Sequence, residues 1–186
     1  MLIKTTVTLS LRLFAYSLLS SIIALILFAA ALLINNDFLN APTTVVTSLI
    51  FWSFSYTLCW RDAMHDRNGV KFGHINRFLP KGIIAGLIAS IPALIVYLLY
   101  IISRSIISEK SSAAIIIHIC YLFLNMPYLS LVNIFHFNAA ALAVLFIPMP
   151  VAACVGYLFG YKQISISEKL IYKNIKNTDN SKQTKR

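Results

Sequence analysis

The densest group of residues that could carry out chemistry lies between residues 61 and 74. Asp62, His65 and Asp66 fall at positions i, i+3 and i+4, so they share one face if this stretch is helical. Such a face could hold a divalent metal ion, or pair His65 with a carboxylate as a general base. Either site would need further ligands or a nucleophile, and His74 is the nearest addition.

A structural interpretation of the same stretch is favoured. Arg61, Arg67 and Lys71 can neutralise the two aspartates, and Asn68-Gly69 can end the helix as a left-handed cap. The stretch then forms a rigid basic corner, which could also dock onto a cytoplasmic partner. No catalytic residue, metal ligand or cofactor is assigned, and the candidate binding residues here are Asp62, His65, Asp66 and His74.

A second irregularity is the run Ile147-Pro148-Met149-Pro150 within an apolar stretch. Two prolines remove two backbone donors and clash with preceding carbonyls, so a helix must kink or break there. Broken helices form substrate sites in transporters because freed backbone groups face a cavity. Prolines are also frequent in spanning helices generally. The structural interpretation is therefore favoured, and Pro148 and Pro150 are kept as candidate binding residues.

The elements that position these residues are membrane-spanning helices. Charged residues make up 12% of the chain, against about 25% in soluble domains, and the mean hydropathy is +0.77. A spanning helix needs about 20 apolar residues, whereas barrel strands would alternate polar and apolar positions. The predicted fold class is an all-α membrane protein, a bundle of four transmembrane helices at about 9–34, 43–60, 82–103 and 137–161.

The distribution of basic residues decides between four and five spans. With four spans and a cytoplasmic amino terminus, fourteen of the sixteen Lys and Arg residues lie inside, and only Arg104 and Lys110 lie outside. A fifth span at 113–136 would move the basic tail or the basic loop outside. That segment is therefore predicted to be non-spanning, with two short helices at the outer face, because it is interrupted by His118, Asn125, Pro127, Asn133 and His136.

Residues 1–161 are predicted to form one helical membrane domain, followed by a basic cytoplasmic tail at 162–186. The first apolar run is longer than the core of a cleaved signal peptide, so it is interpreted as a retained span. The three cysteines fall at three different depths and do not form a disulfide framework.

The run from Asp66 to Gly73, Asp-Arg-Asn-Gly-Val-Lys-Phe-Gly, is followed by Lys81-Gly82, Gly86 and Ile91-Pro92. Over about 30 residues this pattern resembles small uncharacterised bacterial membrane proteins with an Asp-Arg-Asn-x-Val-x-Phe-Gly loop. The resemblance implies a protein of a bacterial plasma (inner) membrane. The distribution of basic residues separately predicts a multi-pass protein with both termini cytoplasmic. The resemblance carries no activity, cofactor or functional residue with it.

Two stripes of small residues suggest how the helices associate. The glycines of these stripes are Gly82, Gly86, Gly156 and Gly160. The stripes can let helices of this one bundle pack closely, or they can join the bundle to a second copy or to a larger membrane complex. The predicted function is an integral membrane accessory or interaction protein without catalysis. The alternatives are a small transporter or channel using the break at Pro148–Pro150, and a membrane enzyme using Asp62–His74. The lipid bilayer is the expected partner. Nucleic acid is not, because the positions of the basic residues are already explained by the membrane topology.

Overall fold

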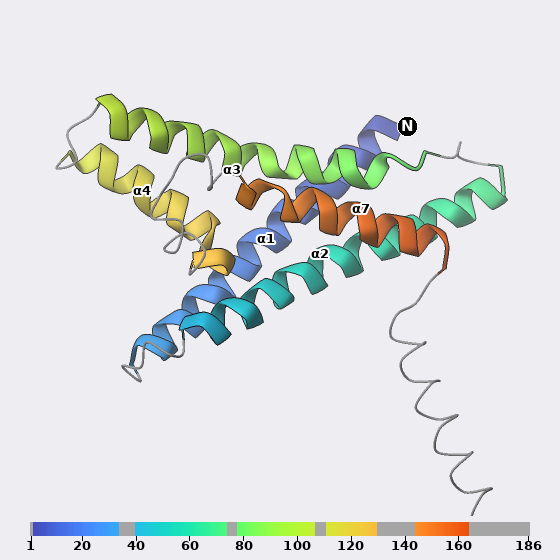
Figure 1. The fold of residues 1–186 in the computed structure, drawn as a ribbon. Coiled ribbons are helices and arrows are strands. Elements are labelled where there is room, and N and C mark those ends of the chain that lie inside the picture. The colour runs from blue at the N-terminus through green and yellow to red at the C-terminus, as the bar shows by residue number, and fades with distance from the viewer. Residues whose placement is uncertain (1, 34–39, 74–77, 107–110, 130–143, 164–186) are drawn as a thin grey trace, which may run out of the picture.

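The computed structural model describes residues 2–33, 40–73, 78–106, 111–129 and 144–163 (Figure 1). These residues form helices joined by short turns, and no strand occurs among them. The all-α class is therefore confirmed for the described residues. The elements are α1 (Leu2–Leu33), α2 (Asn40–Lys71), α3 (Lys81–Ile106), α4 (Ser112–Leu124), α7 (Pro148–Tyr161) and the 3-10 turns η2 (Met126–Tyr128) and η3 (Val144–Phe146).

Three helical segments are long and apolar enough to cross a membrane: Lys4–Ala31, Lys81–Arg104 and Val144–Tyr161. They correspond to three of the four predicted spans. The remaining stretch, 43–60, lies within the 32-residue helix α2. It is less apolar than the others because it contains seven Ser and Thr residues. The fourth span therefore stays a prediction.

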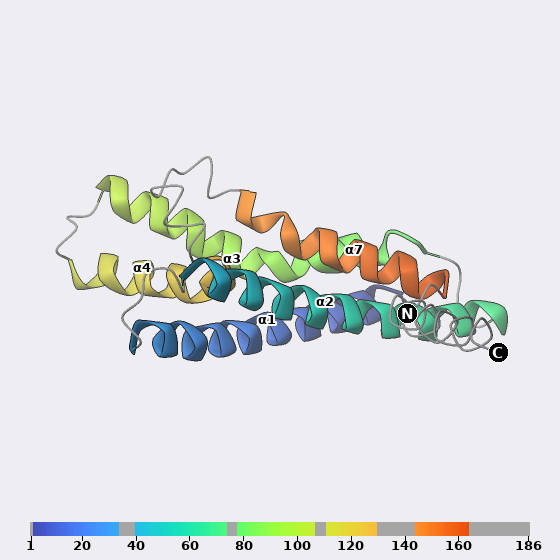
Figure 2. The same ribbon diagram turned by 60° about the horizontal axis from the view of Figure 1, so that its bottom comes forward.

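Helices α1 and α2 form a long antiparallel hairpin, and α3 runs back across it (Figures 1 and 2). Helix α7 packs against both α2 and α3. Both α4 and α7 run antiparallel to α3, and they follow one another along its length. Together, the two shorter helices cover one long helix.

The glycines of the predicted stripes are buried inside the bundle: Gly82, Gly86, Gly156 and Gly160. A Cβ atom at Gly86 would lie 2.7 Å from the Cα of Pro150, so α3 approaches the start of α7 closely. A Cβ at Gly156 would lie 2.7 Å from the carbonyl oxygen of Tyr56 on α2. These glycines thus serve packing within one chain, and an oligomer formed through them stays a prediction.

The segment 113–136 is not one continuous helix. Helix α4 ends at Leu124, where Asn125 caps it and η2 follows, so the predicted break near Asn125 to Pro127 is confirmed. The second predicted helix, from residue 130 onward, lies outside the described residues. Helix α4 also packs along the side of α3, where Tyr121 stacks on Tyr100 with ring centroids 4.8 Å apart.

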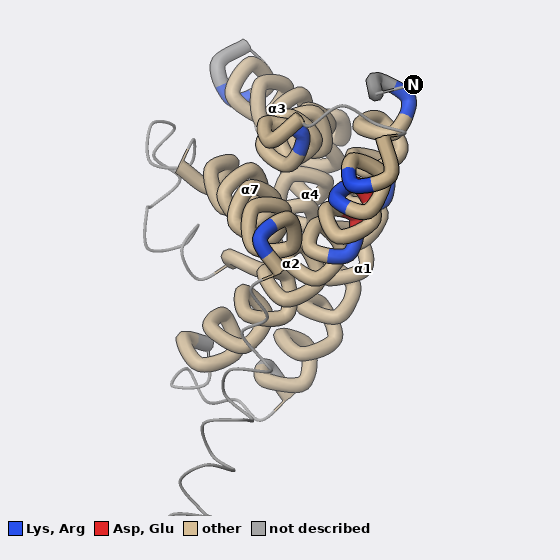
Figure 3. The backbone as a smooth tube through the Cα atoms, turned by 90° about the vertical axis from the view of Figure 1, so that its right-hand side faces the viewer, with Lys and Arg blue, Asp and Glu red and all other residues tan. Residues whose placement is uncertain are grey.

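Basic residues collect at one end of the bundle (Figure 3). Helix α1 begins at this end, which we call the basic end (Figure 1). Arg104 lies in the last turn of α3, at the opposite end. The distribution agrees with the pattern that predicts a cytoplasmic basic end, while the orientation in a membrane stays a prediction. The described basic residues at the basic end are Lys4, Arg12, Arg61, Arg67, Lys71, Lys81 and Lys162.

Candidate functional site

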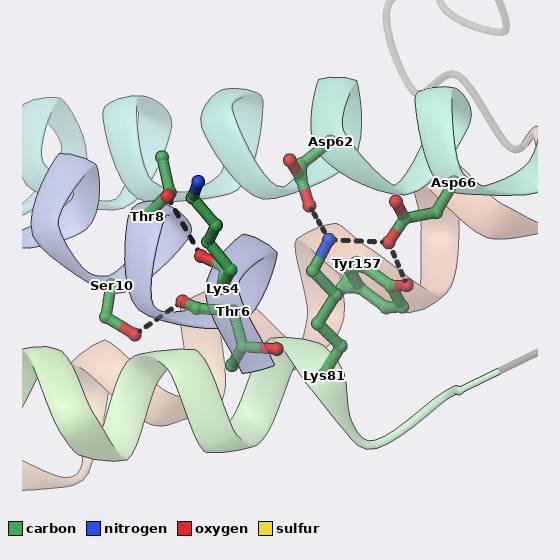
Figure 4. A network of polar contacts seen from close by, with 8 residues as sticks. All are labelled: Lys4, Thr6, Thr8, Ser10, Asp62, Asp66, Lys81 and Tyr157. Carbon is green, nitrogen blue, oxygen red and sulfur yellow. Dashed lines mark hydrogen bonds and ion pairs between the residues drawn. The ribbon is translucent and has the colours of Figure 1, made fainter. Parts of the chain in front are cut away.

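A buried ionic cluster joins three helices at the basic end (Figure 4). Lys81, the first residue of α3, is 2% exposed, and its Nζ lies 2.6 Å from Oδ2 of Asp62 and 2.6 Å from Oδ2 of Asp66, both on α2. Tyr157 of α7 donates its hydroxyl to the same Asp66 oxygen at 2.8 Å. We call these four residues the Lys81 cluster. It ties α2, α3 and α7 together.

The two aspartates meet one lysine because α2 stays helical well beyond the apolar stretch. Asp62 and Asp66 are one turn apart and face the same way. The predicted cap at Asn68-Gly69 is wrong, since the helix continues to Lys71. The left-handed residue is Gly73, with φ of +72°. Its backbone N–H donates to the carbonyl of Val70 and closes the last turn.

The cation that neutralises the aspartates also differs from the prediction. Among the described residues, the ion pairs of Asp62 and Asp66 are made with Lys81, and not with Arg61, Arg67 or Lys71. A buried ammonium group is costly unless it is paired and hydrogen-bonded, and two carboxylates meet that need. The Nζ also lies 6.0 Å from the centroid of the Tyr157 ring. Lys81 therefore acts as a structural cation.

His65, the described histidine of the predicted site, is not part of this cluster. His65 is exposed on α2, one turn from Asp62, and lines the cleft described next. His74 lies outside the described residues. Among the residues that the structure describes, no group of three or more His, Cys, Asp or Glu side chains is arranged to hold a metal ion. Of the three candidates that the structure describes, Asp62 and Asp66 share one partner, whereas His65 only lines the same cleft.

An open cleft of about 760 Å³ lies between α1 and α2, and three residues of the Lys81 cluster, Asp62, Asp66 and Lys81, form part of its lining. The side chain of Lys4 projects from α1 toward α2 beside it (Figure 4). We call this cavity the basic cleft. Its lining residues come mainly from one face of α1 and one face of α2, and they are Lys4, Thr5, Thr8, Leu9, Arg12, Tyr16, Leu58, Arg61, Asp62, His65, Asp66 and Lys81.

The prolines of the second candidate site begin a helix. Helix α7 starts at Pro148, after Ile147, so Pro148 and Pro150 occupy its first turn, where a missing N–H costs no intrahelical bond. A helix break is expected at this run. In the structure a 3-10 turn, η3, precedes Pro148 in place of an α-helix, and the break is confirmed to that extent. A cavity of about 40 Å³ lies beside this start, lined in part by Asn125 and Met149.

The opposite wall of that cavity is the end of α4. The backbone carbonyl of Pro127 accepts a hydrogen bond from Ser48 at 3.0 Å, and the Thr47 hydroxyl lies 3.0 Å from the same oxygen. A carbonyl freed by a helix break needs such donors when it is buried away from water. Asn125 donates its side-chain amide to the carbonyl of Tyr121, one turn back. The backbone carbonyls at the break are therefore satisfied by uncharged hydroxyl and amide donors.

Sequence reasoning missed four residues that hold these two regions together: Lys81, Tyr157, Thr47 and Ser48. Lys81 had one available signal, because a lysine at the head of an apolar helix must either reach water or find acids. Its distance of 15 residues from Asp66 hid the pairing.

Comparisons of the chain with protein-family models, with curated proteins and with solved structures find no match. The function must therefore be argued from the geometry of the two regions.

Proposed function

We propose that this chain is an integral membrane accessory or interaction protein of a bacterial plasma membrane, without catalysis of its own. In this proposal it crosses the membrane four times, with both termini in the cytoplasm and α4 entering the bundle from the outer face. The basic end then faces the cytoplasm, where basic residues are retained.

The observation that carries the proposal is the Lys81 cluster. The acidic side chains that a membrane enzyme would use as a base or as metal ligands are already engaged by Lys81 and Tyr157. Asp66 is 8% exposed, and both carboxylates share one buried ammonium group. Such an arrangement supports a structural role for the residues of the predicted enzyme site.

Photo-crosslinking in intact membranes tests the interaction role. A photoreactive amino acid is placed in turn at Ile22 of α1, Leu98 of α3 and Ile119 of α4, which are 46%, 49% and 58% exposed. An accessory subunit should form a protein adduct of one discrete mass from one of these faces. The other two faces serve as matched controls and should give lipid adducts. Lipid adducts alone from all three faces would contradict the proposal.

A small transporter or channel is the second candidate, and one observation favours it. The end of α4 and the start of α7 meet the same cavity, together with Ala89, Ser90 and Ala93 near the middle of the apolar segment of α3. Two helix breaks at one depth are typical of transporter substrate sites. The cavity of about 40 Å³ holds water but not a larger solute, so transport would require this region to open.

Solute flux separates the second candidate from the first. The purified protein is reconstituted into liposomes, and uptake of labelled ions and small metabolites is compared with uptake by protein-free liposomes. An accessory protein should give no flux above the protein-free control. Flux that falls when Asn125 is replaced by Leu would support the transporter instead, because Asn125 is a polar group lining the central cavity.

A further inference from the structure

The basic cleft carries more positive charge than its own acids can neutralise. Three exposed cations, Lys4, Arg12 and Arg61, line it, and the structure gives none of them an acidic partner among the described residues. The lining also includes two carboxylates and the ammonium group of Lys81, which together offset only one of those three positive charges. An uncompensated set of cations around a cavity attracts an anion.

The kinds of cation present favour a phosphate group. Arg12 and Arg61 carry planar guanidinium groups, which can bind two phosphate oxygens at once. The two come from different helices, so a bound phosphate would bridge α1 and α2. Lys4 adds a third charge at the start of α1. Three cations match a phosphate oxyanion better than a single carboxylate.

The shape of the cleft favours a phosphate that is attached to a lipid. Along α1 the lining runs from Lys4 to Tyr16, which is about 18 Å at the rise of an α-helix. Tyr16 and Leu58 give the part of the cleft beyond Arg12 and Arg61 an apolar wall. Lys4 opens the first candidate span, so in a membrane the cations lie near the headgroups and the apolar wall lies deeper.

We infer that the basic cleft binds the headgroup of an anionic phospholipid, with the phosphate held between Arg12 and Arg61 and an acyl chain running toward Tyr16. This inference rests on the membrane placement proposed above, but not on a protein partner. Specific lipid binding at the cytoplasmic leaflet follows from the charge and geometry of the cleft.

Native mass spectrometry of the full-length protein in detergent tests this inference with phosphatidylglycerol as the probe. The cleft variant is Arg12→Gln with Arg61→Gln. The matched control is Lys71→Gln with Lys162→Gln, which removes the same charge at the same end of the bundle but outside the cleft. The inference predicts one retained phosphatidylglycerol, with binding weakened about 30-fold in the cleft variant and less than about 3-fold in the control.

Two further measurements make the result decisive. Phosphatidylcholine, which has no net charge, should bind more weakly, and glycerol 3-phosphate, the soluble headgroup, should not displace the lipid at equal concentration. If the double variant does not fold, Lys4→Gln alone should still weaken binding about 5-fold.

Equal losses in the cleft variant and its control, or no loss in either, would overturn the inference. Displacement by glycerol 3-phosphate would show that the ligand is a soluble anion. If the protein forms no protein crosslinks but binds phosphatidylglycerol in this way, the proposed interaction role is contradicted and the lipid site stands. A basic end outside the cytoplasm would instead remove the membrane placement on which both proposals rest.

Discussion

Polar groups buried at the basic end and in the middle of the bundle find their partners in different ways. At the basic end, the buried Lys81 and Asp66 and the partly buried Asp62 satisfy one another as charges. In the middle, the broken backbone near Pro127 is satisfied by the hydroxyl groups of α2. Among the described residues, the ion pairs lie near the ends of the helices, and the polar groups buried at the central break are neutral.

The difference shows where rearrangement is possible. Full charges in a poorly hydrated site must all be present together, since removal of one leaves the others unpaired. Neutral hydroxyl and carbonyl groups are cheaper to expose or to pair with water. The Lys81 cluster should therefore fix the bundle, whereas the central break can adjust.

The largest effect is expected when the central cation of the Lys81 cluster is removed. Lys81→Met leaves the buried carboxylate of Asp66 and the partly buried one of Asp62 without a cation, and should lower the free energy of unfolding by about 3 kcal/mol. The measurement is thermal unfolding in detergent. Lys71→Met, at an exposed residue of the same end, should change it by less than about 0.5 kcal/mol. Equal stability of the two variants would contradict a structural role for the cluster.

A somewhat smaller effect is expected where α3 meets α7. Gly86→Val adds atoms where even a Cβ would lie 2.7 Å from the Cα of Pro150, so the two helices must separate. Such overpacking costs about 1–3 kcal/mol. The control is Leu87→Val on the adjacent, exposed face of the same helix. If Gly86→Val unfolds at the same temperature as this control, the close approach is not needed for stability.

The central break should be less sensitive. Ser48→Ala removes one donor to the Pro127 carbonyl and should cost about 1 kcal/mol, because Thr47 can still reach that oxygen. Adding Thr47→Ala should cost more than the sum of the two single losses, since the buried carbonyl then loses both donors. Unfolding of both single variants and the double variant measures this coupling. Strict additivity would mean that the carbonyl finds another partner.

Almost no effect is expected at His65. It is exposed on the cleft wall and contributes nothing to the Lys81 cluster, so His65→Gln should keep membrane abundance and stability within about 0.5 kcal/mol of the unchanged protein. Abundance in membrane fractions and thermal unfolding measure this. A lost cellular phenotype at normal abundance would return His65 to the candidate catalytic residues.

Local patterns predicted much of this fold. Long apolar runs identified α1 and α3, and the helical spacing of Asp62 and Asp66 placed them on one face. The breaks at Asn125–Pro127 and Pro148 followed from backbone chemistry that acts within one turn. Each of these signals depends on neighbours in sequence, and that is why they could be identified without a structure.

The pairing across helices could not be predicted in the same way. Lys81 was counted as one of several loop cations, because nothing local shows that its ammonium turns back toward α2. The packing of α4 depends on the stacking of Tyr121 with Tyr100 of α3 and on the hydrogen bond that Ser48 of α2 donates to Pro127. Long-range contacts of this kind are set by packing and not by periodicity.

The central claim, a membrane bundle with its basic end in the cytoplasm, is tested most directly by single-cysteine labelling in intact cells. In a cysteine-free background, Phe72→Cys probes the basic end and Ser111→Cys probes the opposite end, at the start of α4. A membrane-impermeant maleimide should label Ser111→Cys in intact cells, and Phe72→Cys only after the membrane is opened. Labelling of Phe72→Cys from outside would contradict the topology, and labelling of both from outside would contradict a spanning bundle.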